Sequence, residues 1–160
     1  MDIYLSIKTN AKFNGSIIQG EMNNYLDNMT PLFSINDNGN IVPKDNIFFI
    51  ERGKMADGSS IYITNTDKLE SKNLCFFSGE LEKHIIQFFE LLLYAIKKHP
   101  DAVKNINSNT PFPFIVVYFG TLERSTKIVV NLRGLTIRKS SASLVPKRTS
   151  KSSLVMEIRR

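Results

Sequence analysis

The sequence SGELEKHIIQFFELLLYAIKKH, residues 78–99, contains the one long helical pattern of the chain. Apolar residues recur at spacings of three and four, which is typical of a helix with one wide buried face. Ser78 is a suitable N-cap, Pro100 ends the pattern, and acids precede bases along it as the helix dipole favours. The residues expected on the buried face are Leu81, Ile85, Phe88, Phe89, Leu92 and Ile96. We therefore expect a core helix over residues 78–99.

The flanking segments predict an antiparallel sheet made of hairpins. Residues 2–8 alternate between apolar and polar side chains, which indicates a half-buried strand. Residues 114–119 and 127–132 are apolar, β-branched runs, and they predict a buried hairpin under the helix. Residues 74–77 predict a further strand leading into the helix. Asn-Gly or Asp-Gly pairs at residues 14–15, 38–39 and 57–58 are typical of two-residue hairpin turns.

These patterns predict the fold class. We expect an α+β fold in which an antiparallel β-sheet built from hairpins packs on one long central helix over residues 78–99. Residues 1–134 are expected to form a single domain, and residues 135–160 a basic, Ser-rich, flexible C-terminal tail. Short apolar runs at residues 135–138 and 154–158 leave open a last strand in that region.

Positive charge is concentrated at the C-terminal end of the chain. Residues 133–160 contain eight of the 21 Lys and Arg residues and one acid, for a net charge of +7, whereas residues 1–132 carry −1. This asymmetry indicates a polyanionic partner, either nucleic acid or an anionic membrane surface. A nuclear import signal and a solubilising tail without a partner are the alternatives. The candidate binding residues are Arg133, Arg138, Lys139, Lys147, Arg148, Lys151, Arg159 and Arg160.

Adjacent phenylalanines indicate a surface for self-association. The candidate residues are Phe48, Phe49, Phe76 and Phe77. Neighbouring side chains on a strand point to opposite faces of the sheet, and one helix covers only one face. We therefore expect an exposed aromatic patch, and a homo-oligomer formed through it.

The sequence favours a protein without catalytic residues, bound metal or cofactor. It contains no nucleotide-binding glycine loop, and His84 and His99 are fifteen residues apart, which no zinc site on one helix uses. Asp57, Glu70 and Lys72 have the residue types of a Mg²⁺-dependent nuclease signature. Residues 67–73 are polar apart from one leucine, so a solvated turn is the preferred interpretation.

Compartment follows from the N-terminus and the single cysteine. The first residues carry neither a basic n-region nor an apolar h-region, which predicts an intracellular protein, in the cytoplasm or the nucleus, that is not secreted. Cys75 lies in an apolar run and is expected to be a buried thiol without a disulfide partner. Polar residues interrupt the long helix at every turn, so it is not expected to span a membrane.

One late segment resembles a known family. Pro113-Phe114, an apolar strand, and then Tyr118-Phe119-Gly120-Thr121-Leu122-Glu123 resemble the late hairpin of rhabdovirus matrix proteins. The opening residues 3–13, with Lys-Thr-Asn, are similar to the first strand of that fold. Animal-virus members carry the basic arm and a Pro-Pro-x-Tyr motif at the N-terminus, whereas this chain has its basic arm at the C-terminus and lacks the motif. The resemblance is therefore to a divergent, plant-infecting branch.

The resemblance implies a non-enzymatic structural protein of the virion. Such a protein self-associates, condenses the nucleocapsid or its RNA, and binds an anionic membrane peripherally during assembly. The first alternative is an accessory protein that binds nucleic acid through its basic tail. The third hypothesis is the Mg²⁺-dependent nuclease.

Overall fold

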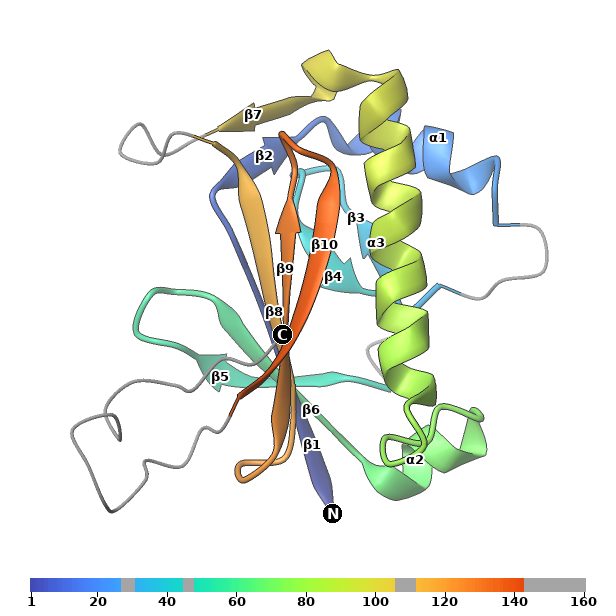
Figure 1. Cartoon of the computed structure of the whole chain (residues 1–160), viewed down its shortest axis with the longest axis vertical. Helices are drawn as coiled ribbons and strands as arrows, with labels where there is room; N and C mark the ends of the chain where they lie inside the picture. The colour runs from blue at the N-terminus through green and yellow to red at the C-terminus, as the bar shows by residue number, and fades with distance from the viewer. Residues whose placement is uncertain (27–30, 45–47, 106–111, 143–160) are drawn as a thin grey trace.

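The computed structural model describes residues 1–26, 31–44, 48–105 and 112–142, and these form an α+β fold (Figure 1). Its main sheet has six antiparallel strands in the order β10-β9-β8-β1-β6-β5. The strands are β1 (Asp2–Thr9), β5 (Ile50–Lys54), β6 (Ser60–Asn65), β8 (Phe114–Gly120), β9 (Ser125–Asn131) and β10 (Thr136–Ala142). The predicted fold class, an antiparallel sheet with helices, is confirmed.

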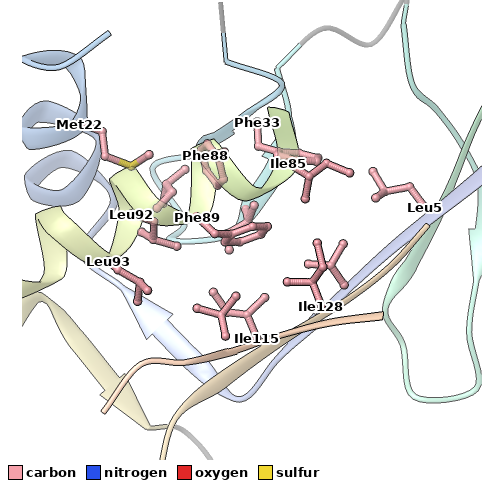
Figure 2. Close-up of a cluster of buried hydrophobic side chains, with 14 of the residues drawn as sticks. Leu5, Met22, Phe33, Ile85, Phe88, Phe89, Leu92, Leu93, Ile115 and Ile128 are labelled. Carbon is pink, nitrogen blue, oxygen red and sulfur yellow. The ribbon is translucent and has the colours of Figure 1, made fainter. Parts of the chain in front are cut away.

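Helix α3 (Glu80–Lys98) lies along one face of this sheet, as Figure 1 shows. Its buried residues include all six that the periodicity predicts, together with Leu93 and Ala95. Phe88 packs edge-on against Phe33 of strand β3 (Phe33–Ile35), with ring centroids 5.2 Å apart. Figure 2 shows side chains from α3, from the sheet and from Met22 of helix α1 (Gly15–Asn23) meeting in one core.

The helix begins one residue later than its expected cap. Gly79, with φ of 84°, is the N-cap of α3, and the Ser78 hydroxyl donates a hydrogen bond to the Cys75 carbonyl instead. The left-handed conformation at this position suits glycine, which lacks a Cβ. The prediction that Ser78 caps the helix is therefore wrong.

The long helix is accompanied by shorter ones and by two small sheets. Strand β2 (Ala11–Phe13) pairs with β7 (Val103–Asn105), and β3 pairs with β4 (Ile41–Pro43). Helix α2 (Thr66–Ser71) follows β6, and a 3-10 helix, η1 (Pro100–Ala102), follows α3. Helix α1 contacts α3 and β3. The long helix is therefore present as expected, but the structure also contains α1 and α2, which were not predicted.

Two of the three predicted hairpins are confirmed, but not their two-residue turns, and the third prediction is wrong. Residues 38–39 lie in the five-residue loop 36–40 between β3 and β4, and residues 57–58 lie in the loop 55–59 between β5 and β6. Asn38 and Asp57 do not have positive φ. At residues 14–15, Asn14 is the N-cap of α1, and its side-chain oxygen accepts a hydrogen bond from the Ile17 N–H at 3.3 Å. Asn14 has φ of −79°, so the pair cannot form a turn that needs positive φ at both positions.

The predicted central hairpin is present, but the strand predicted for residues 74–77 is not. β8 pairs with β9 along its whole length. Residues 76–77 lie in a turn, and the Leu74 N–H donates to the Leu69 carbonyl at the end of α2. The Leu74 N–H is therefore used at the end of α2, and the chain turns directly into α3.

The sheet continues past the expected domain boundary at residue 134. β10 pairs antiparallel with β9 and is the edge strand of the main sheet. The first part of the predicted tail therefore belongs to the folded domain, because its residues 136–142 complete a ladder with β9. Residues 143–160, including the run at 154–158, lie outside the described residues.

Candidate functional site

The face of the main sheet opposite α3 is the candidate site. In β8, Ile115, Val117 and Phe119 are buried against the core, so the alternate side chains point to the other face. Among the described residues, no helix lies over that second face (Figure 1). We call it the open face. Its central members come from β1, β8 and β9: Tyr4, Ser6, Lys8, Phe114, Val116, Tyr118, Lys127 and Val129.

The open face is hollowed into a groove of about 620 Å³. This volume lies within the range of about 300–1,000 Å³ that is usual for ligand sites. The floor of the groove is formed by open-face residues such as Tyr4 and Tyr118. Its rim includes Met55 and Leu122, which are 43% and 53% exposed. The groove is thus largely apolar, with few charged groups around it.

One ion pair spans the edge of the groove. Lys8 Nζ of β1 lies 3.2 Å from Asp57 Oδ2 in the β5–β6 turn. The Ser59 hydroxyl and N–H donate to Asp57 Oδ1 at 2.6 Å and 3.0 Å. These two bonds, and then Lys8, lower the pKa of Asp57 from 3.8 to about 2, since all three favour the carboxylate. Asp57 therefore remains ionised and holds the turn beside β1.

A tyrosine and a lysine lie together on the floor of the groove. Tyr118 and Lys127 are directly opposite each other in the β8–β9 register, and Lys127 Nζ lies 5.6 Å from the centroid of the Tyr118 ring. Tyr4 is paired with Gly120, two residues along β8 from Tyr118 on the same face. The open face therefore presents flat aromatic surface beside a cation, which suits planar or anionic groups.

The structure places three of the eight predicted basic residues. Arg133, in the turn after β9, and Arg138, on the open-face side of β10, are both exposed. Lys139 is on the other side of β10, where its Nζ lies 2.7 Å from Glu82 Oε2 of α3. Lys139 therefore ties β10 to α3. Lys147, Arg148, Lys151, Arg159 and Arg160 lie outside the described residues.

The predicted aromatic patch is wrong for two of its four residues. Phe48 and Phe49 are buried, with 8% and 2% of their surface exposed. They lie in a turn before β5 instead of on a strand, so both rings can pack inward and against each other. Phe76 is half-buried, and Phe77 is 52% exposed in the turn before α3.

The predicted nuclease residues are not brought together. Asp57 precedes β6, whereas Glu70 and Lys72 lie at the end of α2, beyond the other end of β6. Six strand residues span about 20 Å, far more than two carboxylates sharing one Mg²⁺ allow. Within the described part of the chain, no group of three His, Cys, Asp or Glu side chains is placed to hold a metal ion.

A second polar cluster joins α1 to the end of α3. His99 Nε2 lies 2.7 Å from Glu21 Oε1, and Lys98 Nζ donates to the Tyr25 hydroxyl at 2.7 Å. The hydrogen bond with His99 contributes most to lowering the pKa of Glu21. Lys98 Nζ also lies 5.1 Å from the centroid of the Tyr94 ring. Each of these groups has a partner within the cluster. The cluster therefore holds α1 against the end of α3.

Sequence reasoning did not single out Tyr118 and Lys127, which the register places opposite each other. The signal was present in the alternation of β1, which places Tyr4, Ser6 and Lys8 on one face. β8 contains mainly apolar side chains, so its pattern predicted a strand buried on both faces and concealed which residues face outward. Cys75, expected to be buried, is only partly so.

No helix in the described residues is long and apolar enough to cross a membrane. Comparisons of this chain with models of protein families, with curated proteins and with solved structures produced no match.

Proposed function

We propose that this chain is a non-enzymatic structural protein of the matrix type. In this proposal it self-associates and bridges an RNA-containing nucleocapsid and an anionic membrane surface, which it binds peripherally. The observation that carries the proposal is the charge asymmetry, with +7 over residues 133–160 and −1 over the rest. Charge of one sign on a short segment attracts phosphates of RNA and of lipid headgroups alike.

The last described strand of the chain supports the proposal by its position. β10 is an edge strand, and Arg138 is exposed on it. Five more bases follow Ala142 in the sequence. Positive charge thus begins on the folded domain and continues along the chain.

Phe77 is the residue of the predicted aromatic patch that best supports self-association. Its ring packs edge-on against Phe76 at 5.2 Å, yet about half of its own surface stays exposed. Exposed aromatic surface of this kind is enriched in contacts between proteins. The groove of the open face is a second apolar surface.

The test measures binding to single-stranded RNA and to vesicles containing anionic lipid, together with molar mass by light scattering. The variant replaces Lys147, Arg148, Lys151, Arg159 and Arg160 by Gln, so chain length is unchanged. If four or five of these bases engage at once, the log–log salt slope for RNA is steeper by about 3 in the wild type than in the variant. Unchanged binding in the variant would contradict the proposal.

The same measurements separate a matrix-type protein from an accessory protein that binds RNA. The contact between Tyr118 and Lys127 on the open face specifically supports the accessory protein. An accessory protein binds RNA but stays monomeric and does not bind the vesicles. A matrix-type protein increases in molar mass with concentration and binds both ligands. Replacing Phe77 by Ser lowers that molar mass if the exposed ring forms the contact.

A further inference from the structure

We propose that the open face binds single-stranded RNA directly, with bases stacked on Tyr4 and Tyr118 and phosphates held by Lys127 and Arg138. The inference deepens the proposed function, because it assigns the folded domain its own contact with the RNA. It rests on the proposed function only in taking RNA as one of the polyanions.

The first support is the placement of the two tyrosines. They lie on the adjacent central strands β1 and β8, on the same face, in diagonal positions of the register. Diagonal neighbours on antiparallel strands are about 7–8 Å apart, so each ring has room for its own base. Gly120 is opposite Tyr4 and has no side chain to cover the ring. Stacking on aromatic rings of a sheet is a common way for proteins to hold unpaired bases.

The second support is charge. Lys127 lies beside Tyr118, and Arg138 is paired with Val129 one strand further along the same face. The acid at the groove, Asp57, is already paired with Lys8. The face is therefore left with positive charge next to its aromatic surface, which complements a strand that carries a phosphate beside every base.

The same charges disfavour a second copy as the occupant. Two open faces meeting about a two-fold axis would bring together Lys127 and Arg138 of both copies, with Asp57 already neutralised. Like charges placed together at an interface are destabilising. Single-stranded RNA satisfies the same cations and also uses the rings.

The test uses the full chain and the variants Tyr4→Leu, Tyr118→Leu and Lys127→Gln. Leucine keeps apolar surface on the floor of the groove but cannot stack a base. The ligands are an oligouridine of about 12 nucleotides, within the usual site sizes for single strands, and inorganic polyphosphate of similar charge. Tyr94→Leu is the matched control, because it makes the same change at an exposed ring of α3, away from the open face.

Each Tyr→Leu variant is expected to bind oligouridine about 5- to 100-fold more weakly, with polyphosphate binding unchanged. Lys127→Gln is expected to reduce the salt slope for oligouridine by about 0.7, which corresponds to one phosphate contact. The control binds both ligands as the wild type does.

Equal weakening for both ligands, or no weakening, would overturn the inference while leaving binding by the basic segment intact. If Tyr118→Leu has a lower molar mass in light scattering but still binds RNA, the occupant of the open face is a second copy. That result would also overturn the inference. If the wild type binds neither ligand, the proposed function itself fails. Should Tyr118→Leu not fold, photo-cross-linking of a thiouridine oligomer to wild-type protein decides, since the inference requires cross-links within β1 or β8.

Discussion

At the scale of single residues, Asn10 makes a structural contact that no sequence pattern indicates. It is buried, its Oδ1 accepts from the Phe114 N–H at 2.8 Å, and its Nδ2 donates to the Phe112 carbonyl at 3.2 Å. One side chain between β1 and β2 thereby aligns the start of β8. Asparagine is usual in loops, so its residue type alone indicates only a turn.

Replacing Asn10 by Ala is expected to lower the free energy of unfolding by about 1–3 kcal/mol. The substitution leaves the partly buried Phe114 N–H without its acceptor, and losing such a partner costs about that much. Urea unfolding followed by circular dichroism measures the change. Asn40→Ala, at an exposed asparagine, is the control and should change stability by less than about 0.5 kcal/mol. Equal effects of the two substitutions would show that the Asn10 contact is unimportant.

Asp57 predicts a pH-dependent difference in stability. Its pKa falls from 3.8 to about 2 on folding, so the unfolded chain takes up the proton first as pH is lowered. The ionised Asp57 therefore stabilises the fold fully above about pH 4, and this contribution is lost as pH falls through about 2. We expect Asp57→Asn to be less stable than wild type near pH 6, and the difference to disappear as pH falls through about 2. Unfolding by urea at several pH values measures this, and a constant difference would contradict the assignment.

The pairs Asn14-Gly15 and Asn38-Gly39 show where residue-scale prediction stops. Both have the same local sequence, yet the first begins α1 and the second forms a turn in which Gly39 has φ of 80°. What differs is tertiary context: a Cβ on Gly15 would clash with the Asn36 carbonyl oxygen. The helix start therefore packs directly on the β3–β4 turn, a contact that local sequence does not reveal.

At the scale of elements, α3 is the one that the sequence predicts best, because nineteen residues of 3.6-residue periodicity leave little ambiguity. α2 was missed because Leu69 is its only buried residue. Its start is specified by Asn65, whose side-chain oxygen accepts from the Lys68 N–H at 2.9 Å. Short helices that depend on one cap and one packed side chain carry too weak a periodicity to be recognised.

Phe88 tests the packing of α3. It is 1% exposed and contacts Phe33 and Phe89, so Phe88→Ala is expected to cost about 3–5 kcal/mol. Phe77→Ala, at an exposed ring, should cost less than about 1 kcal/mol. Both values come from urea melts. A loss below about 1 kcal/mol for Phe88→Ala would mean that the core can do without this ring.

β10 makes the choice of truncation point critical. A chain ending at residue 142 keeps the β9–β10 ladder and the Lys139–Glu82 pair, and we expect its melting temperature to match that of the full chain. A chain ending at residue 134 loses both, together with the partly buried Ile137, and should melt at least about 5 °C lower. Thermal unfolding of the two truncated chains measures the difference. Equal melting temperatures would show that β10 contributes little.

At the scale of the whole molecule, hairpin turns predicted which consecutive strands pair, but not the order of the sheet. β1 lies between β8 and β6, and its partner residues in β8 are more than a hundred positions away. No turn signal links them, so their pairing follows from packing against α3. The charge asymmetry can be read from the sequence alone. The groove could not be predicted without the order of the strands, because β1, β6, β8 and β9 all line it.

The central position of β1 has a consequence for synthesis of the protein. β1 leaves the ribosome before both of its neighbours, and β8 is complete only at Gly120. Until then the nascent chain carries a hydrophobic strand with at least one unpaired edge, which neighbouring chains can bind. Pairing over such sequence distances is also slow. Cells that make this protein rapidly therefore need chaperone capacity during translation, and slower translation should increase the yield of folded chain.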